Sequence, residues 1–352
     1  GRLDSLTDHD DATGVQLREA VEHVLEIRPG ATPVASLSLV MGRDMLPFTV
    51  QTQGADGRWT VIARVADTDY AQRYVSFPPQ SQPFRLVFAG EKPAPLSLRE
   101  VYLFAEGQAD PALAHDWQAP CDKADMMTIV AHPDDELLWF GGTIPYYAGQ
   151  QGLKLQAVYM TCSNYQRRIE LLNGLWHMGV RQYPVIGPFG DAYSTNMAVI
   201  YDQWGRERVR KYVMGLIRRY KPDVVVTHDR GGEYGHGAHK LCASVAQYCV
   251  ERTGDEAFMP ESAEKWGTWC VKKLYLHLGR ENTVTMDWRV PLSSMGGKTG
   301  LELAQEAYAF HITQHKTSFA VTDEGRTSNA KFSLVYSSVG EDCIGGDFFE
   351  HI

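Results

Sequence analysis

Two clusters of histidine and acidic residues stand out in the sequence, and each comes shortly after a short apolar segment. Their members are His132, Asp134 and Asp135 in AHPDDE, and His236 and His239 in EYGHGAH. Each cluster contains two possible ligands that are three residues apart, a spacing that on a helix places both side chains on one face. Two imidazoles and one carboxylate leave positions open for water and substrate, which is the pattern of catalytic zinc sites.

The chemistry that such a site performs is hydrolysis. A zinc ion lowers the pKa of a bound water to about 7 and polarises a carbonyl group. The same ligand set also suits iron(II), so ligand type leaves the metal open. A simpler interpretation, in which the acids only complement a helix dipole for roughly 0.3 to 1 kcal/mol, explains neither His132 nor the second cluster.

The elements that must position these clusters change character along the chain. Residues 1–108 alternate between apolar and polar positions with frequent turns, which predicts an all-β sandwich of jelly-roll type. Residues 109–124 lack periodicity and predict a linker. Residues 125–352 alternate buried-type strands with helices, which predicts a Rossmann-like α/β domain with a mainly parallel sheet. Sites in such domains lie beyond the carboxyl ends of the strands, where both clusters fall.

The composition excludes some classes of partner. The formal net charge of -9 over 352 residues argues against nucleic acid, because phosphate binding needs a basic surface. No run of about eighteen apolar residues occurs, so we expect no transmembrane segment. The six cysteines include no CxxC pair and are uninformative about the redox compartment.

AHPDDE, followed by two glycines, and the later EYGHGAH resemble the two signature motifs of the PIG-L/LmbE family of zinc-dependent N-deacetylases. The resemblance covers roughly residues 124–350. It implies a Zn2+ enzyme that removes the acetyl group from an N-acetylated amino sugar or glycan. It also implies that Asp134 is the general base and that the metal ligands are His132, Asp135 and His239.

The same resemblance implies roles for five further residues. His236 would stabilise the oxyanion or protonate the leaving amine, and Tyr234 would polarise the substrate carbonyl. RRIELL is similar to an arginine and glutamate pair of the family, which implies that Arg167 or Arg168 lies near the substrate. Asp191 resembles an acid that contacts the sugar in some relatives.

One departure from the family pattern concerns the partner of His236. Members commonly carry Asp where this chain has Ala238, so the carboxylate that usually orients this histidine is missing. Either Asp229 or Glu233 takes the place of that carboxylate, or His236 is less basic than expected, and the sequence leaves these alternatives open.

The segment 187–204 is long for a connection in an α/β unit, and such loops are often functional. Its residues Tyr193 and Trp204 would either stack on a sugar or anchor a packed surface loop, two roles that we consider equally supported. Elsewhere, His311 and His315 are four residues apart but lack the glutamate of HExxH, which indicates a surface or capping role.

The N-terminal region resembles the discoidin-like (F5/8 type C) modules that often bind carbohydrate. SLTDHDDATG is similar to their calcium loop, and REVYLF is similar to their closing strand. The resemblance implies a Ca2+ site with four oxygen ligands, Asp8, Asp11, Thr13 and Glu100. An acidic surface loop on a packing-only domain is the alternative. By this resemblance we expect a secreted or cell-surface bacterial protein.

The function that the sequence predicts is metal-dependent hydrolysis of an N-acetyl group on an amino sugar or glycan. Two alternatives stay open at this point. One is an amidase that acts on a thiol conjugate or a lipid-linked glycan. The other is a glycan-binding adhesin with a decayed catalytic domain, against which the intact AHPDDE motif argues.

Overall fold

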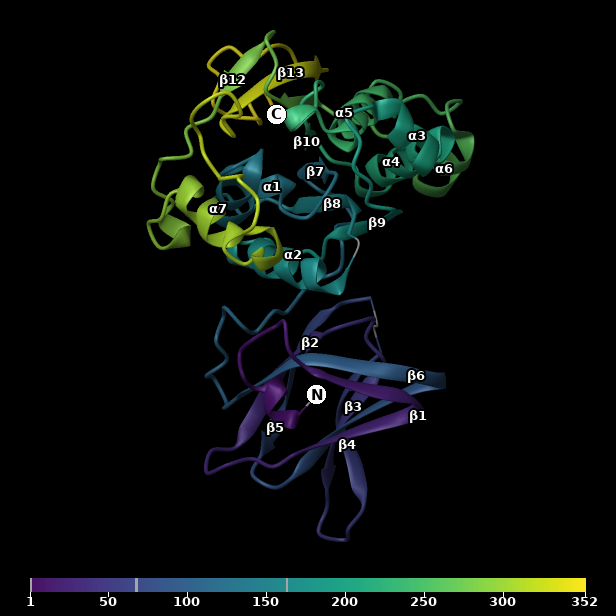
Figure 1. The fold of residues 1–352 in the computed structure, drawn as a ribbon, viewed down its shortest axis with the longest axis vertical. Helices are drawn as coiled ribbons and strands as arrows, with labels where there is room; N and C mark the ends of the chain where they lie inside the picture. Colours follow the sequence, from purple (N-terminus) through teal and green to yellow (C-terminus); the bar gives the residue numbers. More distant parts are fainter. Residues whose placement is uncertain (1, 67–68, 163) are drawn as a thin grey trace. The chain divides into compact units, whose positions relative to one another are not determined.

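The computed structural model describes residues 2–66, 69–162 and 164–352. It divides into two compact units, Gly1–Gln118 and Ala119–Ile352, and each unit has its own hydrophobic core (Figure 1). Among the described residues, no helix is long and apolar enough to cross a membrane.

The boundary between the units lies within the segment that the sequence predicts as a linker. Its first part, residues 109–118, belongs to the first unit. His115 Nδ1 lies 2.7 Å from the side-chain oxygen of Gln72, and Trp117 Nε1 donates to the same oxygen at 3.2 Å. Because Trp117 is buried, this segment packs as part of the unit instead of crossing solvent.

The first unit is rich in antiparallel strands. The elements are η1 (Leu3–Leu6), β1 (Val15–Ile27), β2 (Val34–Met41), β3 (Phe48–Gln53), β4 (Trp59–Val65), β5 (Gln72–Gln80) and β6 (Phe84–Phe104). The strand order is β4-β3-β6-β2-β5, and β1 pairs with β6. Leu37 and Leu39 of β2 and Leu86 and Phe88 of β6 are fully buried, and the serines beside the leucines of β2 are buried as well. The sheet-rich character is confirmed, and the jelly-roll sandwich stays a prediction.

The second unit is built on a mixed sheet. Its strands are β7 (Met126–Val130), β8 (Leu155–Thr161), β9 (Val185–Phe189), β10 (Val224–Thr227), β11 (Lys273–His277), β12 (Thr283–Thr285) and β13 (Lys331–Ser337). The order is β12-β13-β11-β10-β7-β8-β9. The run from β11 to β9 is parallel, whereas β13 pairs antiparallel with both β11 and β12. The central strands are buried along their whole length, as expected for a parallel sheet covered on both faces.

Helices cover both faces of this sheet. They are α1 (Asp135–Leu138), α2 (Tyr165–His177), α3 (Met197–Trp204), α4 (Arg206–Tyr220), α5 (Gly237–Val250), α6 (Pro260–Trp266) and α7 (Gly300–Tyr308). Shorter turns are η2 (Pro145–Gln150), η3 (Glu233–Gly235), η4 (Ser293–Met295) and η5 (Ile312–Gln314). Figure 1 shows α4 and α5 on one side of the strands and α1, α2 and α7 on the other. The apolar stripe of α4 packs into the core through Val209, Val213, Leu216 and Ile217.

The chain order of the parallel strands reverses beside β7. From β7 the chain continues to β8 and β9 on one side, and then returns to β10 and β11 on the other side. The loops that follow β7 and β10 therefore leave the same edge of the sheet in opposite directions. A crevice at such a switch point is where α/β proteins place their ligands.

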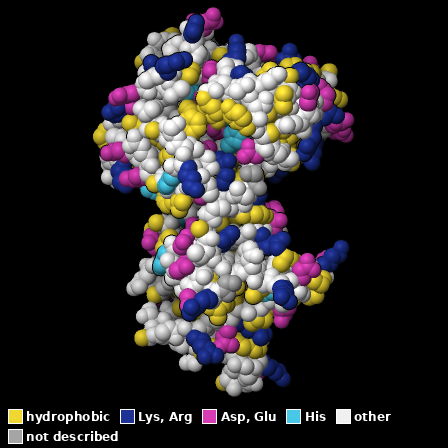
Figure 2. All heavy atoms as spheres, viewed as in Figure 1, with side chains coloured by type: hydrophobic (Ala, Val, Ile, Leu, Met, Phe, Trp, Pro, Cys, Tyr) yellow, Lys and Arg dark blue, Asp and Glu magenta, His cyan; other side chains and the backbone are white. Residues whose placement is uncertain are grey.

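Lys and Arg side chains are interspersed with Asp and Glu side chains over the face that Figure 2 shows.

Candidate active site

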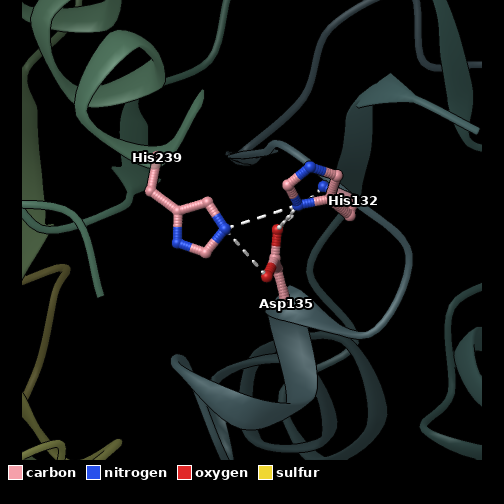
Figure 3. A group of neighbouring side chains, drawn as sticks. All are labelled: His132, Asp135 and His239. Atoms are coloured by element: carbon pink, nitrogen blue, oxygen red, sulfur yellow. Dashed lines mark hydrogen bonds and ion pairs between the residues drawn. The ribbon is translucent and has the colours of Figure 1, made fainter. Parts of the chain in front are cut away.

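Three side chains that were predicted as metal ligands meet at the switch point between β7 and β10 (Figure 3). His132 follows β7, Asp135 begins α1, and His239 lies in the first turn of α5. His132 Nδ1 is 3.1 Å from Asp135 Oδ2, and His239 Nε2 is 3.3 Å from Asp135 Oδ1. The two ring nitrogens are 3.4 Å apart. All three side chains are buried.

The spacing of these ligand atoms fits a transition-metal ion. A tetrahedral ion with bonds of about 2.0 to 2.1 Å holds its ligand atoms about 3.3 Å apart. The two histidine nitrogens are 3.4 Å apart, and each lies 3.1 or 3.3 Å from one of the two oxygens of Asp135. Two imidazole nitrogens and one carboxylate suit zinc or iron(II).

The carboxylate of Asp135 is held in its ionised form. Its Oδ2 accepts the backbone N–H of His132 at 2.8 Å, and its Oδ1 accepts the indole N–H of Trp139 at 2.9 Å. Burial opposes ionisation, but His239 and His228 outweigh it and hold the pKa of Asp135 well below its usual range.

Glu233 is a buried carboxylate that holds three histidines. Its Oε2 accepts from Nδ1 of His239 at 2.7 Å and of His228 at 2.8 Å, and its Oε1 accepts from Nδ1 of His277 at 2.7 Å. The N–H of Ala131 donates to Nε2 of His228, which places that ring proton on Nδ1. With its proton directed at Glu233, His239 presents an unprotonated Nε2 to the other ligands.

Sequence reasoning missed this arrangement. Glu233 was one of two alternatives for orienting His236, and the structure assigns its carboxylate to His239, His228 and His277 instead. A signal was present in the sequence, because the segments VVVT and KLYL are each followed directly by a histidine, His228 and His277.

The ring of His236 is oriented by the backbone. His236 is the N-cap of α5, and its Nδ1 accepts the N–H of Ala238 at 3.1 Å. The ring proton of the neutral imidazole is therefore on Nε2. Burial, followed by the neighbouring His132 and His239, lowers the pKa of His236 to about 3.

Asp134 lies beside the ligands with Arg167 next to its carboxylate. Arg167 Nη2 donates to the carbonyl of Pro133 at 2.5 Å and lies 3.4 Å from Asp134 Oδ1. Burial and the charge of Asp135 raise the pKa of Asp134 well above its usual range, and Arg167 acts in the opposite direction. Arg167 is positioned by the start of α2, where Asn164 caps its backbone N–H at 2.8 Å.

Asp191, which was predicted to contact sugar, lies on the far side of His132. Its Oδ1 is 3.5 Å from His132 Nε2, and its Oδ2 is 3.6 Å from Arg167 Nη1. The structure distinguishes the two candidate arginines, because the guanidinium of Arg168 lies over the ring of Tyr165 at 4.6 Å. Arg167 is the one that reaches Asp134 and Asp191.

Aromatic rings surround His236. The ring of Tyr193, which is 73% exposed, is 5.1 Å from the ring of His236, and Tyr234, which is 45% exposed, is 5.6 Å from it. Phe319, from the segment after α7, lies 4.8 Å from Tyr234. Sequence reasoning missed Phe319, because no motif surrounds it.

Two further interpretations are resolved by burial. Trp204 does not face solvent: it is 2% exposed, stacks on Phe189 at 4.9 Å and donates to the carbonyl of Gly190. It therefore anchors the loop. Of the surface or capping role expected for His311 and His315, the surface alternative is wrong for His311, since its ring is fully buried against α2 near Gly174, whereas His315 is exposed.

The candidate calcium ligands of the first unit are also brought together in part. Thr13 Oγ1 donates to Asp8 Oδ2 at 2.9 Å, and the N–H of Asp10 donates to Asp8 Oδ1 and to Glu100 Oε1. Burial and the hydrogen bond with Asp8 raise the pKa of Glu100 to about 7, and the charge of Asp11 adds to this effect.

Comparison with known proteins gives an independent indication of the second unit's family. Residues 127–250 match the family model of the GlcNAc-PI de-N-acetylases, PIG-L. The matched segment contains the three candidate ligands, Asp134 and His236.

Curated relatives include two bacterial proteins and one fungal protein. The 1D-myo-inositol 2-acetamido-2-deoxy-alpha-D-glucopyranoside deacetylase 1 of Catenulispora acidiphila is 25% identical over 45% of this chain and 56% of its own length. The deacetylase 2 of the same name from Saccharopolyspora erythraea is 28% identical over 42% and 63%. A probable N-acetylglucosaminyl-phosphatidylinositol de-N-acetylase of Schizosaccharomyces pombe is 26% identical over 39% and 56%. The chain thus spans 56 to 63% of the length of these relatives.

Solved structures with some likeness include proteins of two kinds. The N,N'-diacetylchitobiose deacetylase of Pyrococcus horikoshii is 20% identical, with a TM-score of 0.42 over 56% of this chain and 74% of that chain. A chitosan-binding module of a Paenibacillus sp. IK-5 chitosanase/glucanase is 15% identical, with a TM-score of 0.26 over 30% and 85%. The family match over residues 127–250 is the finding that bears most on the second unit: this part of the chain is similar to the PIG-L family of deacetylases.

Proposed function

We propose that the protein is a metal-dependent hydrolase that removes the acetyl group from an N-acetylated amino sugar. The observation that carries the proposal is the meeting of three candidate ligand side chains, with the two histidine nitrogens 3.4 Å apart and each 3.1 or 3.3 Å from one oxygen of Asp135, and with the buried carboxylate of Asp134 beside them. The family match over the same residues supports it, as do relatives whose names describe deacetylation of N-acetylglucosamine compounds.

The residues that would hold the ion are His132, Asp135 and His239. Zinc is our first choice and iron(II) the second. When bound, the ion supplies positive charge that acidifies water and polarises the amide carbonyl. Asp134 accepts the proton of the attacking water and delivers it to the leaving amine, as a general base and then a general acid. Arg167 opposes the rise in the pKa of Asp134 that burial and Asp135 cause, and so favours the ionised form before that transfer.

Two donors are available to the oxyanion that forms during the attack. His236 carries its proton on Nε2, because its Nδ1 accepts the N–H of Ala238. Burial and the nearby acids Asp135 and Asp134 raise the pKa of Tyr234, so its hydroxyl keeps its proton and can donate. Donors fixed in this way stabilise the developing negative charge.

In this proposal the sugar binds against the aromatic rings around His236. Tyr193, Tyr234 and Phe319 offer ring faces to the apolar side of a pyranose, and the two tyrosines add hydroxyl groups. Asp191 bridges His132 and Arg167, which favours orientation of His132 over direct contact with the sugar.

The test combines elemental analysis of the purified protein with a free-amine release assay. The substrates are N-acetylglucosamine, N,N'-diacetylchitobiose and an N-acetylglucosaminyl inositol. We expect one metal ion per chain, amine release from at least one substrate, and loss of activity on removal of the metal with a chelator. Asp134→Asn should abolish turnover with the metal retained, and Asp202→Asn, on the exposed side of α3, should not.

Other outcomes separate the alternatives. Bound metal without amine release from any sugar would contradict the sugar substrate and favour an amide in a thiol conjugate. Absence of metal would contradict the enzyme proposal and favour an adhesin. Full activity of the Asp134→Asn variant would contradict the role of Asp134.

For the first unit we propose carbohydrate binding with a structural calcium ion. His9 has a φ of 61°, which is the left-handed conformation of the glycine that the discoidin-like loop has at this position. Glu100 Oε2 is buried and has no hydrogen-bond partner among the described residues. Calcium titration of the protein and of the Glu100→Gln variant tests the site, because equal responses would contradict it. Export from the cell stays a prediction.

A further inference from the structure

We propose that Glu136 is a positioning residue that holds the backbone of Asp134 in its reactive conformation. This inference rests on the proposed function, because it takes Asp134 to be the general base. Glu136 Oε2 accepts the backbone N–H of Asp134 at 3.1 Å. The contact joins a buried acid of α1 to the residue that caps the same helix.

The conformation of Asp134 needs such support. Its φ is 100° and its ψ is -24°, in the left-handed region that residues with a Cβ adopt only at a cost. Asp134 precedes the first turn of α1, so its N–H has no acceptor within the helix. A buried N–H without an acceptor would destabilise the turn further. Glu136 provides that acceptor.

A second contact holds the same turn from the other side. Arg167 Nη2 donates to the carbonyl of Pro133, the residue before Asp134. The Pro133–Asp134 peptide group is therefore held by two hydrogen bonds. Its carbonyl accepts from Arg167, and its N–H donates to Glu136. The Asp134 side chain is thereby directed from a fixed backbone, as a preorganised base requires.

Glu136 acts through Asp134 and touches no reacting group. Its side chain is fully buried, and the three candidate metal ligands are other residues. Its Oε1 has no hydrogen-bond partner among the residues that the structure describes, and its Oε2 faces the Asp134 N–H. A carboxyl oxygen accepts an N–H whether or not the group is protonated, so the role does not depend on the charge of Glu136.

The test compares Glu136→Gln, which keeps an oxygen acceptor, with Glu136→Met, which has a similar length and none. We expect Glu136→Met to lower kcat by about 100-fold, with KM and metal content per chain unchanged, because small displacements of a reacting group have effects of this size. Glu136→Gln should retain kcat within about threefold. Wild-type kcat per bound metal in the Met variant, or equal losses in both variants, would overturn the proposal.

A second readout needs no substrate. Hydrogen exchange at the Asp134 amide should be slow in the wild type and in Glu136→Gln, and faster in Glu136→Met. Equal protection in the three proteins would overturn the proposal. Where the Met variant is unstable, the wild type and the Gln variant must still be protected. Absence of deacetylation by the wild type would instead contradict the proposed function, and the exchange measurement still tests the contact.

Discussion

Glu233 accepts a hydrogen bond from Nδ1 of His239 at 2.7 Å, so a buried carboxylate lies directly behind a candidate metal ligand. In the Glu233→Gln variant, an amide NH2 group would face at least one of the three histidine N–H groups that now donate to a carboxylate. We expect Glu233→Gln to weaken metal binding by about 10- to 100-fold, the usual effect of losing such a partner. Competition with a chelator measures this, and Glu264→Gln, exposed on α6, is the control. Unchanged affinity in Glu233→Gln would show that the carboxylate does not orient His239.

Arg167 and Asp134 form the second relationship that can be tested. Burial and Asp135 raise the pKa of Asp134, and Arg167 opposes that rise, so Arg167→Met should raise the pKa further. A general base must be ionised to accept a proton. We therefore expect the acidic limb of the pH–rate profile to move to higher pH, with kcat at neutral pH lowered by about tenfold.

The neighbouring Arg168 provides the comparison for this measurement. Because its guanidinium stacks on Tyr165, Arg168→Met should leave the acidic limb where it is in the wild type. A shift in the Arg168 variant equal to that of the Arg167 variant would contradict the assignment.

Tyr193 should contribute to sugar binding and little to the chemical step. Its ring is 73% exposed and lies 5.1 Å from the ring of His236. Aromatic contacts are worth about 0.5 to 1.5 kcal/mol, so Tyr193→Ala should raise KM by roughly 2- to 10-fold with kcat retained. Tyr193→Phe keeps the ring face and should raise KM less than Tyr193→Ala does. Steady-state kinetics on a disaccharide measures both, and a normal KM in the Ala variant would rule out stacking on Tyr193.

Glu100 should make the stability of the first unit depend on pH. Burial and the hydrogen bond with Asp8 raise its pKa from 4.5 to about 7 in the folded protein. The folded state thus binds this proton more tightly, and the stabilisation is complete below the unfolded pKa and is lost as pH rises through the folded pKa. In calcium-free buffer the unfolding temperature should fall between about pH 4.5 and about pH 7.

Calorimetry of the full chain checks this expectation. Glu100→Gln should remove the dependence on pH, and Glu106→Gln, exposed in the turn after β6, should keep it. An unfolding temperature that rises over this pH range would show that Glu100 is not the group that controls stability.

Local sequence determined the ligand types and the elements that carry them. AHPDDE follows an apolar run and EYGHGAH runs into the first turn of a helix, and both statements depend only on neighbours in the chain. Hydrophobic runs and periodicity report whether a segment is covered on one face or two, which is why the alternation of strands and helices was predictable. The residue types also predicted hydrolytic metal chemistry.

Contacts between distant residues were decided by the tertiary structure. His132 and His239 are 107 residues apart in the chain and meet because β7 and β10 are neighbours in the sheet. Glu233 holds His277, from 44 residues further along, and Phe319 reaches Tyr234 from beyond the family match. Strand order and loop packing arise from long-range contacts, and local periodicity does not encode these.

Two aromatic residues of the segment 187–204 show the same limit of prediction from sequence. The sequence offers Tyr193 and Trp204 equally for a sugar contact, since a stacking ring and an anchoring ring need the same residue type. The fold exposes Tyr193 and buries Trp204 against Phe189. The residue types were set by the sequence alone, and the difference in their roles came from the burial that packing imposes.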